Sequence, residues 1–248
     1  MKDREVSTDK IRMAENCLKV YIMGNVQLSY NDRPIVLGGV LSGKVLQLFL
    51  ILLYFGEEGI GRDDLLDMLY GSGEYSNPAN NLRAIVYRLR KALKDMLPPH
   101  EYIRTVGGVY RWDNGPTSLY VDAKDFKVTA LQAMSEGNPE DLKRACELYK
   151  GEFLSQMASE SWVTVEEVRY QEMYFNCLRL AYEKLWEKRE YDSLLELCSR
   201  ACELYPYEEC QIMKLDCLIA MKRFRDAMEL YQKVTRQYLK GLSVRPRW

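Results

Sequence analysis

The chain changes its hydrophobic pattern near residue 112, and this change limits the possible folds more than any other feature. Before it, short runs of β-branched and aromatic residues alternate with amphipathic segments; after it, apolar residues recur at helical spacing. A strand-containing part followed by a helical part is typical of two separate domains, and 248 residues are enough for two. We therefore predict a flexible tail over residues 1–16, a mixed α and β domain over 17–114, and an all-helical domain over 117–248.

The first domain is predicted to contain a small antiparallel sheet, three helices and a tight β-hairpin. Gly107 and Gly108 separate the hairpin strands, and a two-residue glycine turn suits the twist of such strands. Asn77 and Pro78 mark the start of the third helix, because proline suits the first helical position. The expected strands are 18–23, 26–30, 33–37, 102–106 and 109–112, and the expected helices are 44–54, 62–70 and 77–96.

The second domain is predicted to consist of helical hairpins, after a linker at 114–116 beyond which we expect no strand. Residues 191–197 can be aligned with 224–230 at a spacing of 33 residues, and Pro206 ends the first helix of the earlier unit. A period near 34 residues with two helices per unit is typical of tetratricopeptide (TPR)-like repeats, whose helices bury their apolar stripes by stacking. The expected helices are 122–136, 139–150, 162–188, 191–204, 208–221 and 224–240.

Two groups of residues resemble chemical sites but lack an essential part. Residues 38–44 fit the phosphate-binding pattern G-x-x-x-x-G-K, but the next position is Val45, where a hydroxyl would have to hold Mg²⁺. Four cysteines between 198 and 217 contain no C-x-x-C pair, and His100 is the one histidine of the sequence, so helical core positions explain them better than zinc. Without a histidine near a nucleophile we expect no enzyme, and we also expect no cofactor and no metal.

Composition narrows the class of protein further. The 35 basic and 36 acidic residues give a net charge of −1, which excludes a polycation but permits a local basic surface. No apolar run is long enough to span a membrane, and the charged N-terminus lacks the apolar core of a signal peptide. The seven cysteines lie mostly among apolar helical positions, which suits reduced thiols in a cytoplasmic protein.

The helix expected over 77–96 carries the clearest candidate binding surface. Its predicted buried stripe comprises Leu82, Ile85, Val86, Leu89 and Leu93. Between Arg83 and Lys94 the sequence holds five cations and no acid, whereas a solvated helix face usually mixes both signs. A solvated face remains the alternative, but the pattern favours nucleic acid, since arginine and asparagine can bind base edges while lysine suits phosphates.

The hairpin that follows adds a second cationic element close in sequence. We predict that both elements contact double-stranded DNA. The candidate DNA-binding residues are Asn80, Arg83, Ala84, Tyr87, Arg88, Arg90, Lys91, Lys94, Arg104, Thr105 and Arg111. The competing hypothesis is a scaffold that binds a partner protein through its TPR-like groove and whose first domain does not read DNA.

Particular residues also resemble a known family. Residues 81–93 and 103–112 resemble the recognition helix and the wing of OmpR/PhoB-type DNA-binding domains. Residues 149–154 (YKGEFL), Trp162, Arg169 and the 191–239 hairpins resemble the bacterial transcriptional activator domain. Together, in this order, they resemble SARP-type (AfsR/DnrI-like) transcriptional regulators over nearly the whole chain.

This resemblance implies a fold and a function. The fold is an α+β winged helix-turn-helix domain followed by an all-α TPR-like helical-hairpin domain. The third helix would enter the major groove, and the wing would touch the adjacent minor groove or the backbone. The resemblance further implies binding to direct repeats near promoters, activation through RNA polymerase, and a homodimer formed through the helical domain.

Overall fold

The computed structural model describes residues 16–71 and 78–243, so residues 1–15 of the predicted tail and the Asn77 cap lie outside the described residues. The chain forms two compact units. The first comprises Met1–Asp125 together with Glu152–Val168, and the second comprises Phe126–Gly151 together with Arg169–Trp248. The first unit therefore takes in two segments that follow the predicted linker, and each unit is described below by itself.

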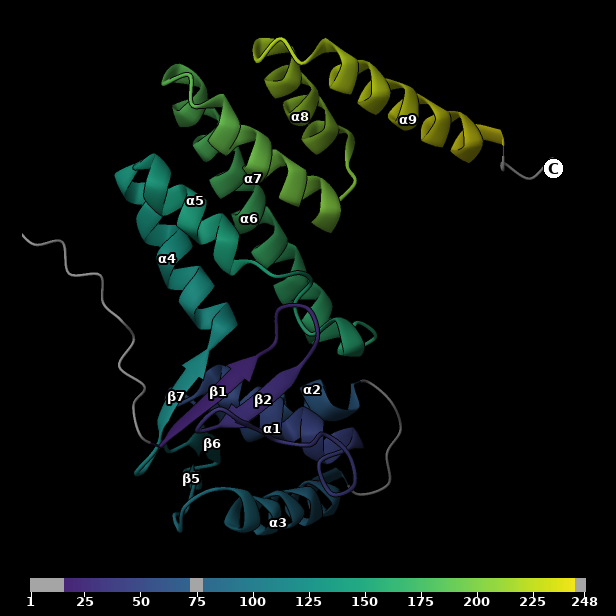
Figure 1. Ribbon diagram of the computed structural model, residues 1–248. Helices are drawn as coiled ribbons and strands as arrows, with labels where there is room; N and C mark the ends of the chain where they lie inside the picture. The colour runs from purple at the N-terminus through teal and green to yellow at the C-terminus, as the bar shows by residue number, and fades with distance from the viewer. Residues whose placement is uncertain (1–15, 72–77, 244–248) are drawn as a thin grey trace, which may run out of the picture. The chain divides into compact units, whose positions relative to one another are not determined.

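The first unit contains a four-stranded mixed sheet in the order β3-β2-β1-β7 (Figure 1). Its strands are β1 (Cys17–Tyr21), β2 (Gln27–Tyr30), β3 (Arg33–Pro34) and β7 (Ser118–Val121). Leu18 and Val20 of β1 are fully buried while their neighbours are not, as alternation in a sheet with one covered face requires. The predicted antiparallel pairing of β1 with β2 is confirmed.

The expectation of no strand after 114–116 was wrong. Strand β7 pairs in parallel with β1, joining Leu18 to Leu119 and Val20 to Val121. Four residues are too few for a period-two pattern to be distinguished from the start of the next helix, and a parallel partner 101 residues away leaves no local signal. The buried Asp122, directly after β7, links the ends of β7 and β1. Its carboxylate accepts hydrogen bonds from the backbone N–H groups of Ile22 and Met23 at 2.9 and 3.1 Å.

Three helices and a second sheet complete the predicted winged helix-turn-helix arrangement. The helices are α1 (Gly43–Phe55), α2 (Arg62–Tyr70) and α3 (Pro78–Met96), and the sheet has the order β4-β6-β5 with strands β4 (Ile60–Gly61), β5 (Ile103–Val106) and β6 (Val109–Trp112). Strands β5 and β6 form the predicted hairpin, which we call the wing. Its turn residues Gly107 and Gly108 have φ of 58° and 80°, values that favour glycine at both positions.

Helix α1 forms the centre of this unit and contacts α2, α3 and β6. All six residues from Leu48 to Leu53 are buried, so the helix is covered on nearly every side. Phe49 packs against Trp112 of the wing with ring centroids 5.7 Å apart, and Trp112 stacks on Tyr102 at 5.2 Å. The wing is thus anchored in the core of the first unit.

The second unit is helical, as predicted. The helices that contribute to it are α4 (Asp122–Glu136), α5 (Pro139–Leu148), α6 (Ser161–Glu187), α7 (Tyr191–Leu204), α8 (Glu208–Ala220) and α9 (Phe224–Ser243); a short 3-10 turn, η1 (Ser155–Met157), lies in the first unit. Helix α7 packs along α8 and α8 along α9, as successive hairpins (Figure 1), with Pro206 in the α7–α8 turn. Whether these hairpins are of the TPR type stays a prediction.

The core of the second unit is rich in tyrosine. Tyr149, Tyr174 and Tyr205 are at most 4% exposed, and the hydroxyl groups of Tyr149 and Tyr205 lie 2.6 Å apart in a hydrogen bond. Tyr149 also stacks on Tyr174 with centroids 4.5 Å apart. These tyrosines therefore serve core packing, and the hydroxyl groups of Tyr149 and Tyr205 are bonded to each other.

The structure places the residues that resembled a phosphate-binding loop in a turn, and the cysteines that resembled a zinc site are free thiols. Gly38 and Leu41 pair through their backbones in a turn ahead of α1. All seven cysteines are free, and five of them are buried. Within residues 16–71 and 78–243, no group of three or more histidine, cysteine or acidic side chains is arranged to hold a metal ion. In the same residues no helix is both long and apolar enough to cross a membrane.

Candidate nucleic-acid interface

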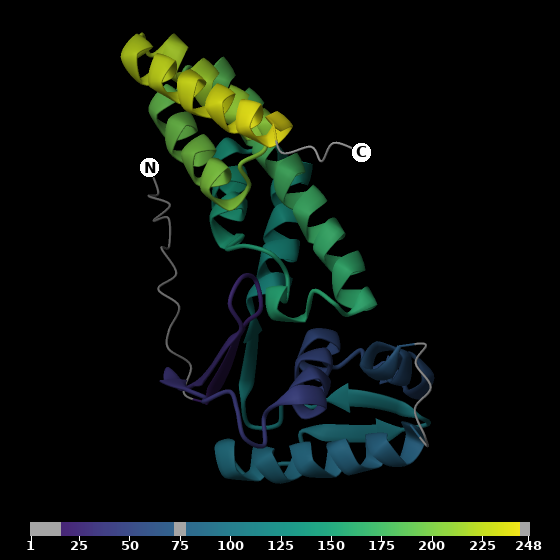
Figure 2. The ribbon, with the colours of Figure 1, turned by 90° about the vertical axis from the view of Figure 1, so that its right-hand side faces the viewer.

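Helix α3 has two chemically distinct sides, as its sequence predicts. The apolar stripe is confirmed, because Leu82, Ile85, Val86, Leu89 and Leu93 are all at most 6% exposed. This stripe packs against α1 and α2. Figure 2 shows α3 on the outer side of the first unit, so its other side faces away from the core.

The outward side of α3 gathers the predicted contact residues. The exposed ones are Asn80, Arg83, Ala84, Tyr87, Arg88, Lys91 and Lys94. Tyr87 is 70% exposed, so most of its ring is open to a binding partner. Within the part of the chain that the structure describes, Arg83, Arg88, Lys91 and Lys94 form no ion pair. Their charges are therefore available to an anionic partner.

Arg90 differs from the other cations of α3 because it is half-buried and already engaged. Its Nη2 donates a hydrogen bond of 2.8 Å to the carbonyl oxygen of Ile103 and lies 3.4 Å from the carboxylate of Glu101. Its buried Nε has no acceptor among the described residues. Arg90 thus ties α3 to strand β5 and has less freedom than its neighbours to reach DNA.

The wing places its two predicted arginines on one face and Thr105 on the other, because side chains alternate along a strand. Arg104 of β5 and Arg111 of β6 are direct partners across the hairpin, and both are exposed. The next pair, Ile103 and Trp112, lies on the opposite face and is buried. Thr105 is exposed one position closer to the turn. Two arginines side by side would repel each other, and Asp113 offsets this because its carboxylate forms an ion pair with Arg104.

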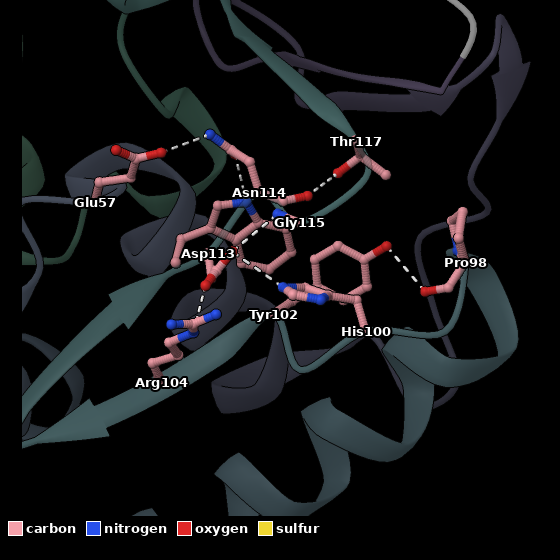
Figure 3. Close-up of polar contacts among 10 residues, drawn as sticks. Glu57, Pro98, His100, Tyr102, Arg104, Asp113, Asn114, Gly115 and Thr117 are labelled. Carbon is pink, nitrogen blue, oxygen red and sulfur yellow. Dashed lines mark hydrogen bonds and ion pairs between the residues drawn. The ribbon is translucent and has the colours of Figure 1, made fainter.

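Asp113 joins several elements at the base of the wing (Figure 3). Besides the ion pair with Arg104, its Oδ1 accepts a hydrogen bond from the Gly115 N–H at 2.9 Å and lies 3.0 Å from Nε2 of His100. Burial acts to raise the pKa of Asp113, but the Gly115 hydrogen bond, His100 and Arg104 together lower it below its usual value. The carboxylate is therefore more stable as an anion in the folded protein than in the unfolded chain.

We expect Asp113→Asn to destabilise the first unit by about 1 kcal/mol at pH 7, since the amide keeps the shape but not the charge. A lowered pKa stabilises the fold above the unfolded pKa near ~4, and this contribution is lost as the pH falls through the folded value. The difference between wild type and variant should therefore shrink below about pH 4. Urea unfolding at several pH values measures it, with the exposed Asp67→Asn as control; a pH-independent difference would contradict the role of the charge.

Two supports of the interface were not predicted from the sequence. His100 and Asp113 position the wing, yet their only signal is that His100 is the one histidine of the sequence. Strand β4 pairs with β6, and the Arg62 N–H donates to the Gly108 carbonyl at the wing turn. Gly59, ahead of β4, has φ of 76°, and a Cβ there would lie 2.7 Å from the carbonyl oxygen of Tyr110. A glycine is required because the backbones approach so closely.

The chemistry of this surface suits a nucleic acid. An arginine can bind both acceptors of a guanine edge, an asparagine can bind adenine, and lysine binds phosphate as a point charge. The outward face of α3 carries these residue types on one rod, whose dimensions fit a DNA major groove. No arrangement of a nucleophile with a base occurs in this surface as the structure describes it.

The fold and this surface define a winged helix-turn-helix protein with an appended domain of helical hairpins. The family model of the bacterial transcriptional activator domain matches residues 121–247. The chain belongs to this family. No curated protein sequence matches it.

A solved structure shares the fold over nearly the whole chain. It is described as Mycobacterium tuberculosis EmbR in complex with a low-affinity phosphopeptide, and it matches with a TM-score of 0.64 and 17% identity. The match covers 94% of this chain and 62% of that one, so this chain spans less than two thirds of EmbR's length. The family match confirms the resemblance to SARP-type regulators, and family and fold together point to a transcription regulator and not to an enzyme.

Proposed function

We propose that this protein is a sequence-specific DNA-binding regulator, and an activator, whose helix α3 reads the major groove. The observation that carries the proposal is the outward face of α3, where Arg83, Arg88, Lys91 and Lys94 are exposed without an ion-pair partner in the described residues. Such a face costs electrostatic repulsion in a free protein, and a polyanion removes this cost. Arg83 and Arg88 are assigned to bases, and the lysines to phosphates.

The remaining features support secondary parts of this proposal. Arg111 and Thr105 of the wing contact the backbone beside the groove, while Arg90 and Arg104 hold the wing in position and contribute charge. Membership of the activator family supports binding to promoter direct repeats in the bacterial cytoplasm, contact with RNA polymerase, and a homodimer on DNA. In this proposal the first unit reads DNA and the second unit makes these protein contacts.

Salt dependence provides a quantitative prediction. If five cations of one subunit reach phosphates, the logarithm of the binding constant should fall against the logarithm of salt concentration with a slope of about −4.5 per bound subunit. Titration of a labelled promoter fragment by fluorescence anisotropy at several salt concentrations measures this slope. A slope near zero would contradict contact between the cationic face and phosphates.

Selection of bound duplexes from a random DNA library tests the proposal most directly. A regulator of this kind should enrich one motif, and two copies in the same orientation would report the spacing of direct repeats. A scaffold that does not read DNA should enrich no motif.

A further inference from the structure

A cavity of about 790 Å³ lies in the first unit between the C-terminal half of α3 and the segment that leads into β5. Sites for small organic ligands usually enclose ~300–1,000 Å³, so the volume fits this class. Leu93 and Tyr102, both 2% exposed, contribute apolar lining, and Pro99 adds to it from the connecting segment. The lining is more apolar than polar.

The charged groups that line the cavity are mostly positive. Arg90, Lys91 and Lys94 come from α3, and the imidazole of His100 adds a polar group from the opposite segment. The one acid in the lining, Glu101, lies 3.4 Å from Arg90 and is therefore compensated. Lys91 and Lys94 form no ion pair within the described part of the chain, and Arg90 keeps donor capacity at Nε. A negatively charged group bound in the cavity would neutralise the positive charge of these side chains.

Aromatic rings give the cavity a preference for flat ligands. Tyr87, which is 70% exposed, stands on the α3 side. On the other side His100 and Tyr102 pack edge to face with centroids 5.0 Å apart. A DNA phosphate needs cations but gains nothing from an apolar, ring-lined hollow, whereas an aromatic anion uses both features. The lining therefore favours a small molecule over the DNA backbone.

We infer that this cavity binds a small organic anion with a flat apolar body, and that such a ligand controls the interface on α3. Tyr87, Lys91 and Lys94 belong both to the cavity lining and to the candidate DNA-binding residues. A carboxylate bound to the two lysines would withdraw them from phosphates and place a negative charge beside the duplex. Ligand and DNA then exclude each other. This control rests on the proposed function, while binding of the anion does not.

The first experiment measures binding to the full chain without DNA. 1-Naphthoate serves as the probe because it joins one carboxylate to a flat ring, and 1-naphthamide is its neutral control. We expect 1-naphthoate to shift the backbone amide NMR signals of residues 87–102 saturably, and 1-naphthamide to bind at least about tenfold more weakly. Equal shifts with both compounds, or shifts confined to other residues, would overturn the inference.

Three variants test whether the NMR shifts caused by 1-naphthoate arise from binding in the cavity. Lys94→Glu should weaken 1-naphthoate binding by roughly tenfold or more. Lys127→Glu, at an exposed position of α4, makes the same charge change outside the cavity and should have no effect on this binding. Pro99 is an exposed lining residue, so Pro99→Trp should fill the cavity and leave the fold intact. If Pro99→Trp binds 1-naphthoate as wild type does, the assigned location is wrong.

The second experiment measures control of DNA binding. Saturating 1-naphthoate should lower the affinity of wild type for its promoter about tenfold and leave Pro99→Trp unaffected. If wild type binds 1-naphthoate but no DNA, the proposed function fails and the anion site stands. If the probe gives no shifts while Lys94→Glu and Pro99→Trp both weaken DNA binding, DNA itself occupies the cavity and the inference fails.

Discussion

Replacing Arg83 and Arg88 together by alanine should abolish specific DNA binding, with a loss of affinity of at least about a hundredfold. Each arginine that binds a guanine edge contributes about 1–3 kcal/mol of discrimination, and ~1.4 kcal/mol corresponds to a tenfold change. Both side chains are exposed on α3 and free of ion pairs in the described residues, so their removal disturbs no packing. Gel shift with the selected operator and with a scrambled duplex measures the effect.

Single variants distinguish recognition of base edges from non-specific electrostatic attraction between the protein and DNA. Arg83→Ala, Arg88→Ala and Tyr87→Ala should each weaken operator binding while leaving the unfolding transition unchanged. Lys127→Ala combined with Arg144→Ala removes two exposed cations from the second unit and is the control for net charge. Unchanged affinity in all three single variants would defeat the assignment of α3 as the reading helix.

Trp112→Ala should destabilise the first unit by about 3–5 kcal/mol, a large share of the stability of an ordinary domain. Trp112 is 1% exposed and packs between Phe49 of α1 and Tyr102. Its Nε1 donates a hydrogen bond to Asn114, and its backbone N–H donates one to Gly56. Truncation leaves a cavity that these rigid neighbours cannot fill, so the wing separates from α1.

Urea unfolding, followed by near-UV circular dichroism and by DNA binding, checks this result. Trp112→Phe keeps an aromatic ring between Phe49 and Tyr102 but loses the hydrogen bond to Asn114, so it should cost only about 1–2 kcal/mol. A loss below ~1 kcal/mol for Trp112→Ala would show that the wing does not depend on this contact.

Local patterns in the sequence were sufficient for most of the secondary structure. The third helix was expected over 77–96 and is described over Pro78–Met96, because proline fixes its start and the spacing of Leu82, Val86 and Leu89 fixes its buried side. The wing was equally clear, since two adjacent glycines between β-rich runs permit one tight turn. Helical spacing likewise predicted the second unit.

Contacts between distant residues were not predictable in the same way. Strand β7 pairs with β1 across 101 residues, and the partners of Arg90 and Arg104 lie on other elements. The sequence did not show which of the cations between 83 and 111 bind groups on other elements. The structure separates Arg83 and Arg88, which are exposed without ion pairs in the described residues, from Arg90 and Arg104, which stabilise the wing.

The sequence by itself determined the order of the helices and of the wing strands, the apolar stripe of α3 and the concentration of cations opposite to it, because these depend on residues a few positions apart. The tertiary structure alone decided which cations remain free, how Asp113 and His100 hold the wing, and where the cavity beside α3 lies. These properties depend on distances between side chains that are remote in the chain. A periodic pattern records which side of a helix is buried, but it does not record what faces that helix.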